Sequence, residues 1–63
     1  MTPIEQEELL VLAQELGAIY YFDETYVMTA SSFDERMGLN YPSRVDIEDF
    51  IRLFGKWLLG NTP

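Results

Sequence analysis

The first sixteen residues have the spacing of apolar and polar positions that is typical of an amphipathic helix. At about 100° per residue, five apolar side chains fall on one arc, opposite most of the acids. These five are Leu9, Leu10, Leu12, Ala13 and Leu16. Thr2 and Glu5 form a capping box around Pro3, and Gly17 suits the position after a helix. The pattern predicts a helix from about Pro3 to Leu16.

Two runs rich in aromatic and β-branched residues follow, residues 18–22 and residues 25–30. The acidic pair Asp23 and Glu24 separates them, so the pattern predicts a β-hairpin. Because this break lacks the glycine that a two-residue turn prefers, a longer loop is expected. The spacing leaves the register of the two strands open.

Strict alternation along the first run predicts that both faces of this strand carry large apolar groups. Tyr20 and Phe22 would point to one face, and Ile19 and Tyr21 to the other. Whichever pair faces outward would form an exposed aromatic patch, and the pattern does not decide between them.

A shorter helix is expected after the hairpin. Ser32 and Glu35 have the spacing of a second capping box, and Gly38 suits the end of one or two helical turns. Residues 39–44 contain Asn40 and Pro42 and predict a loop.

The last predicted helix has the clearest apolar face. Asp46 suits its N-cap, and Val45 can contact Phe50 across the first turn. Apolar residues then recur at spacings of three and four, and residues 60–63 end the helix. The apolar positions are Ile47, Phe50, Ile51, Phe54, Trp57 and Leu58.

The order helix, β-hairpin, short helix, helix predicts one α+β domain over residues 1–63. Both long helices would pack on one face of a small antiparallel sheet, which gives two layers. The other face of the sheet would stay uncovered. Four aromatic residues are candidates for a contact there or in a homodimer: Tyr20, Phe22, Tyr26 and Tyr41.

The composition removes several classes of function. The chain has 63 residues with no Cys and no His, so thiolate metal sites, disulfides and histidine-based catalysis are absent. The paired acids lack the spacing of a calcium loop. We therefore expect no enzyme activity, no metal and no cofactor. No apolar run is long enough to cross a bilayer, so a cytoplasmic protein is expected.

The excess negative charge lies in the first part of the chain. The net charge is −7; residues 1–35 carry eight acids and no Lys or Arg, whereas the remainder sums to +1. In the last helix, Glu48 and Asp49 have Arg52 three or four residues away. The eight uncompensated acids predict a partner-binding face: Glu5, Glu7, Glu8, Glu15, Asp23, Glu24, Asp34 and Glu35.

Four basic residues in a −7 chain cannot neutralise many phosphates, which argues against direct binding of nucleic acid. The natural partner is instead a basic surface. A rigid array of carboxylates could occupy the groove that another protein uses for DNA, repeating the spacing of the phosphates.

In size, charge and lack of motifs, the chain resembles small phage-encoded anti-CRISPR proteins of the DNA-mimic kind. The resemblance implies binding to a type I Cascade-type effector in the host cytoplasm and a block of target DNA recruitment. The alternative from the residues themselves is a small homo-oligomeric structural or regulatory module, paired through the aromatic hairpin face.

Overall fold

The computed structural model describes residues 2–60 and begins with helix α1, Pro3–Glu15. The Glu5 amide donates to the Thr2 hydroxyl oxygen over 3.2 Å, as the capping box predicts. Leu16 caps the other end, and Gly17 follows it with a φ of 82°, a backbone conformation that favours glycine. The predicted helix is confirmed.

Strands β1, Ile19–Phe22, and β2, Tyr26–Thr29, form the predicted antiparallel hairpin. Its loop spans residues 23–25, longer than a two-residue turn, as expected. The prediction of strict alternation in β1 is wrong, because the register shifts between Ile19 and Tyr21. An irregularity of this kind changes which side chains share a face.

Helix α2, Ser31–Met37, ends at Gly38, which has a φ of 74°. The prediction of a capping box at Ser32 is wrong, because the N-cap is Ala30 and no side chain caps it. The Ala30 amide donates to the Ala18 carbonyl over 2.9 Å. This contact with the start of the hairpin fixes the chain just before the helix begins.

A third strand, β3, Arg44–Asp46, takes the last residue of the predicted loop and the two residues that were expected to lead into the last helix. It pairs antiparallel with β2, so the sheet order is β1-β2-β3. Three residues are too few for an alternating pattern to identify a strand. Tertiary pairing with β2 therefore creates this strand.

Helix α3, Ile47–Gly60, follows β3 directly and has the predicted apolar face. Phe50 and Phe54 stack with ring centroids 5.3 Å apart, and Phe33 from α2 lies 5.4 Å from Phe50. One cluster of buried residues joins all three helices to the sheet. Its members are Leu10, Ala13, Ala18, Ile19, Val27, Phe33, Ile47, Phe50 and Phe54.

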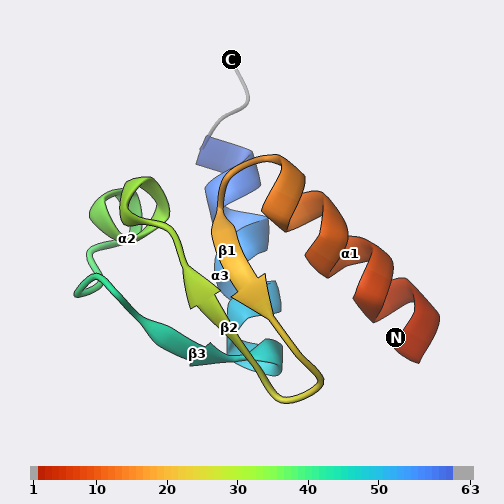
Figure 1. Ribbon diagram of the computed structural model, residues 1–63. Coiled ribbons are helices and arrows are strands. Elements are labelled where there is room, and N and C mark those ends of the chain that lie inside the picture. Colours follow the sequence, from red (N-terminus) through yellow and green to blue (C-terminus); the bar gives the residue numbers. More distant parts are fainter. Residues whose placement is uncertain (1, 61–63) are drawn as a thin grey trace.

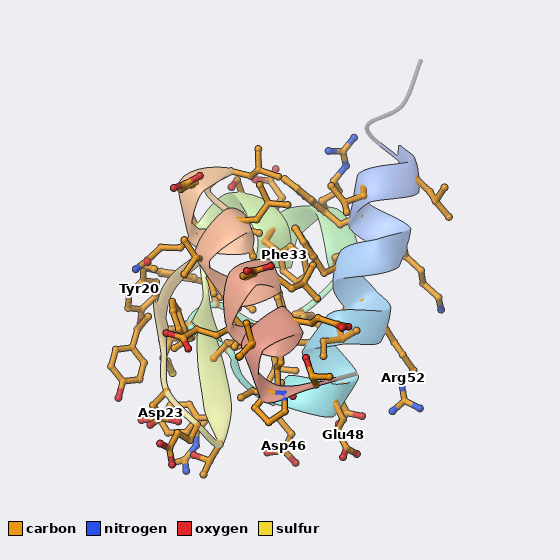
Figure 2. All side chains as sticks on the ribbon, turned by 90° about the vertical axis from the view of Figure 1, so that its right-hand side faces the viewer. Tyr20, Asp23, Phe33, Asp46, Glu48 and Arg52 are labelled. Carbon is orange, nitrogen blue, oxygen red and sulfur yellow. The ribbon has the colours of Figure 1, made fainter. Side chains whose placement is uncertain are left out.

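The fold is the predicted two-layer α+β arrangement, with the third strand added. Figure 1 shows α1 beside β1 and α3 behind the sheet. Turned by 90°, the sheet lies on the left of Figure 2 and the two long helices lie to its right, with Phe33 in the interior. The opposite face of the sheet is therefore left without a helix. None of the helices in residues 2–60 has the length and apolar character needed to cross a membrane.

Candidate functional site

Three acidic segments meet at one end of the molecule. They are the hairpin loop, the start of α1 and the junction of β3 with α3 (Figure 1). The Ile47 amide donates to the Thr25 carbonyl over 3.4 Å, and Tyr26 pairs with Asp46 across the sheet. Figure 2 shows Asp23, Asp46 and Glu48 at this same end. The fold therefore joins acids from both halves of the sequence.

We call this end the acidic pole and define it by Glu7, Asp23, Glu24, Asp46, Glu48 and Asp49. These acids line two open hollows. One hollow, of about 490 Å³, lies between α1 and the hairpin; the other, of about 310 Å³, lies between the hairpin loop and α3. Gln6 and Glu24 line both, so the two hollows adjoin and the carboxylates form one continuous surface.

The carboxylate of Asp23 is fixed by the hairpin loop. Its Oδ1 accepts hydrogen bonds from the Thr25 amide, the Thr25 hydroxyl and the Tyr26 amide, over 2.7, 2.8 and 3.1 Å. Its Oδ2 accepts the Tyr21 hydroxyl over 3.1 Å. The hydrogen bond from the Thr25 backbone amide, more than any other contact, lowers the pKa of Asp23 to about 2. The same carboxylate raises the pKa of the Tyr21 hydroxyl by accepting a hydrogen bond from it. This acid is therefore ionised and held in place at neutral pH.

Little positive charge offsets the pole. No Lys or Arg lines either hollow in the part of the chain that the structure describes. Asp49 is the exception among the six acids, because it forms the predicted ion pair with Arg52. Both α1 and α3 begin at this end, so the positive ends of two helix dipoles partly offset the repulsion between the carboxylates.

The carboxylates are spread over a surface. Within residues 2–60, no group of three acidic side chains is arranged to hold a metal ion. A spread of carboxylates around shallow hollows is suited to contact several cationic side chains of a large partner at once.

The structure divides the eight acids of the predicted binding face. Glu7, Asp23 and Glu24 meet in the acidic pole. Glu5 and Glu8 are exposed on α1 near it. The other two exposed acids lie towards the opposite end of the molecule (Figure 1), at the last residue of α1 and on α2. They are Glu15 and Glu35.

Asp34 is not part of any exposed face, so that prediction is wrong. Its exposed fraction is 1%, and its Oδ1 accepts the hydroxyl of buried Thr29 from β2. Its Oδ2 has no hydrogen-bond partner in the described residues. Phe33 and Asp34 are the buried residues of α2, so Asp34 lies on the side of this short helix that packs against the core.

Sequence reasoning missed Asp46, Glu48 and Asp49. They follow Arg44 and precede Arg52, so the charge of their segment looks balanced. The pairing of β3 with β2 sets them beside the hairpin loop. The local pattern carries no signal for this neighbourhood, because a strand of three residues is too short to be identified from alternation.

A second surface is the uncovered face of the sheet. We call it the open sheet face and define it by Tyr20, Tyr21, Tyr26, Met28 and Arg44. The pairs Tyr21 with Met28 and Met28 with Arg44 place these three side chains on one side of the sheet, and Tyr26, two residues before Met28 in the same strand, lies on that side as well. Figure 2 shows Tyr20 on the side away from the helices. The shifted register exposes Tyr20 and Tyr21 together, by 51% and 42%.

Two of the predicted aromatic contacts lie elsewhere. Phe22 packs against the core cluster, so its inclusion in an exposed patch is wrong. Tyr41 is 55% exposed but lies in the loop between α2 and β3. Its peptide bond to Pro42 is cis. Tyr21 takes the place in the patch that the prediction gave to Phe22.

Comparison with protein-family models, curated proteins and solved structures found no match to this chain.

Proposed function

We propose that this protein is a non-catalytic inhibitor whose acidic pole occupies a basic nucleic-acid-binding surface of another protein. The observation that supports it most is the convergence of six carboxylates from three segments around two adjoining hollows. With the pole in place, nucleic acid is excluded from the partner's groove. The resemblance to DNA-mimic anti-CRISPR proteins makes a Cascade-type effector in the bacterial cytoplasm the partner of first choice.

Electrostatics supports this choice of partner. The chain carries a net charge of −7, and no Lys or Arg lines the hollows beside the six pole acids in the part of the chain that the structure describes. Such a surface attracts a positively charged groove over a distance and aligns the two proteins before contact. The same grooves attract DNA phosphates, so the two ligands compete for one set of Lys and Arg side chains.

Partial fixing of the array also supports the proposal. The Asp23 carboxylate is held by four hydrogen bonds within the hairpin. For Asp46 and Glu48 the backbone alone is fixed, by strand pairing and by helix α3. Carboxylates that are already positioned lose little conformational freedom on binding.

The test is capture of a partner from a bacterial lysate with the immobilised protein, at low and at high salt. We expect a nucleic-acid-binding protein that is released by salt and by added duplex DNA. The pole variant Glu24→Gln/Glu48→Gln should bind this partner roughly two- to thirtyfold more weakly, because two exposed charge contacts are lost.

The control variant is Glu15→Gln/Glu35→Gln. It removes the same two charges from exposed positions outside the pole and should bind nearly as well as the native protein. Equal weakening in both variants would show that only total charge matters. That result, or a complex that added DNA does not disturb, would contradict the proposal.

A further inference from the structure

The open sheet face has aromatic rings that no helix covers. Tyr20 is 51% exposed and Tyr21 42% exposed, and Figure 2 shows Tyr20 on the side of the sheet away from the helices. The Tyr21 ring packs against the Tyr26 ring in a tilted arrangement, with centroids 5.7 Å apart. The face is therefore an aromatic surface with a fixed part, Tyr21 and Tyr26, and an exposed extension at Tyr20.

One guanidinium group already lies on this face. The Cζ atom of Arg44 is 4.0 Å from the centre of the Tyr26 ring, within the range of a cation–π contact. Arg44 reaches the ring from β3, and Tyr26 stands in β2. The geometry demonstrates how an arginine fits against a tyrosine of this sheet.

The face is continuous with the acidic pole through Asp23. The Tyr21 hydroxyl donates to Asp23 Oδ2 over 3.1 Å, and Asp23 also lines the hollow between α1 and the hairpin. Asp46, another pole acid, pairs across the sheet with Tyr26. A partner bound at the acidic pole would therefore also contact the tyrosines of the open sheet face, because the two surfaces adjoin at Asp23.

The charge around the open sheet face favours a basic partner over a second copy of this chain. A second copy would bring another chain of net charge −7 against a surface that borders carboxylates. A basic partner instead meets the carboxylates of Asp23 and Asp46, which border the face beside Arg44. A guanidinium group stacks on tyrosine better than an ammonium group does, because it is planar and more weakly hydrated.

We infer that the open sheet face takes arginine side chains of the basic partner, which stack on Tyr20 and Tyr21 beside the Asp23 carboxylate. This rests on the proposed function and adds the chemistry of the contact. Specificity for arginine over lysine then comes from the tyrosines, and general affinity for positive charge comes from the acidic pole.

The test compares an oligoarginine peptide with an oligolysine peptide of the same length, added to the intact protein at fixed salt. We expect tighter binding of oligoarginine, by at most roughly thirtyfold, which corresponds to the full value of two exposed cation–π contacts. The double variant Tyr20→Leu/Tyr21→Leu should lose this preference. The control variant Tyr41→Leu removes an equally exposed tyrosine outside the face and should keep it.

A second measurement does not depend on how the variants fold. In the native protein, aromatic ring signals of Tyr20 and Tyr21 in NMR spectra should shift with oligoarginine and much less with oligolysine, while those of Tyr41 stay in place. Equal affinity for both peptides, or unmoved signals of Tyr20 and Tyr21, would overturn the inference.

The two proposals fail in different ways. If the pole variant Glu24→Gln/Glu48→Gln weakens binding of both peptides and the tyrosine variant changes nothing, the acidic pole stands and the arginine contact is rejected. If sedimentation shows a dimer that Tyr20→Leu/Tyr21→Leu dissociates, a second copy covers the face and the inference is rejected. If the pole variant binds both peptides as well as native protein does, the proposed function fails.

Discussion

At the scale of single residues, Asp23 connects the fold to the candidate site. Its Oδ1 orders the hairpin loop through three hydrogen bonds, and its Oδ2 orients the Tyr21 hydroxyl. One side chain thus closes the hairpin, lines a hollow of the acidic pole and borders the open sheet face. A change at this position is expected to affect stability as well as binding.

The lowered pKa of Asp23 makes part of the stability depend on pH. The pKa is about 2 in the folded state and 3.8 in an unperturbed carboxyl, so the folded protein favours the ionised form. This contribution is complete above about pH 4 and is lost as the pH falls to about 2. Asp23→Asn keeps a carbonyl acceptor for the loop amides and has no proton to gain.

We therefore expect the native protein to unfold at a higher temperature than Asp23→Asn at pH 5, and the difference to shrink towards pH 2. Thermal unfolding followed by circular dichroism across this range is the measurement. Glu24→Gln, at the exposed neighbouring position, is the control and should show no comparable trend. A constant difference between native protein and Asp23→Asn would contradict the expectation.

At the scale of elements, the two long helices differ in which side chains they bury. Helix α3 buries an aromatic ladder, Phe50 and Phe54 extended by Trp57, whose ring centroid is 5.7 Å from that of Phe54. Helix α1 buries only Leu10 and Ala13 fully. The remaining apolar side chains of α1, among them Leu12 at 42% exposure, stay partly in solvent. Helix α3 therefore contributes more to the core than α1 does.

Two glycines in helical segments should respond oppositely to alanine. Gly55 is exposed inside α3 and an added Cβ would meet nothing within 4 Å, so Gly55→Ala should raise the free energy of unfolding by about 0.5–1 kcal/mol. Gly38 ends α2 with a φ of 74°, so Gly38→Ala should lower it by about 1–2 kcal/mol.

Urea denaturation of the two variants measures both changes. Neither substitution fills or empties space in the core, so the comparison isolates backbone conformation. A loss of stability in Gly55→Ala would mean that α3 is distorted at this turn.

At the scale of the whole molecule, the charge distribution is uneven. The acidic pole gathers at the end where two helices begin and the hairpin turns. The basic side chains of α3, Arg52 and Lys56, border a mainly apolar hollow with Leu39, Val45 and Leu53, and Asp49 of the pole also lines it. The repulsion within the pole lowers the stability of the free protein, and a basic partner would relieve it.

Salt should therefore stabilise the free protein. The Debye length falls from about 30 Å at 0.01 M to about 8 Å at 0.15 M, which screens repulsion among the pole acids. Relief of about 1 kcal/mol would raise the melting temperature by roughly 4–8 °C in a chain of this size. The melting temperature of Glu24→Gln/Glu48→Gln should rise less than that of Glu15→Gln/Glu35→Gln. A native melting temperature that falls with salt would argue against net repulsion.

The sequence by itself determined the elements that arise from local spacing. The period of the apolar residues set α3 and its buried face, and the capping box at Thr2 with Gly17 bounded α1. The polar break at Asp23 and Glu24 set the hairpin. These features depend on residues a few positions apart, whose interactions are the same in any fold.

Only the tertiary structure decided which residues make the site. Strand β3 exists through its pairing with β2, and that pairing brings Asp46 beside the hairpin loop. The shifted register of β1 turns Tyr20 and Tyr21 outward together, and packing of α2 takes Asp34 into the core. Each outcome depends on contacts between segments far apart in the chain, and neither periodicity nor charge counts carry that information.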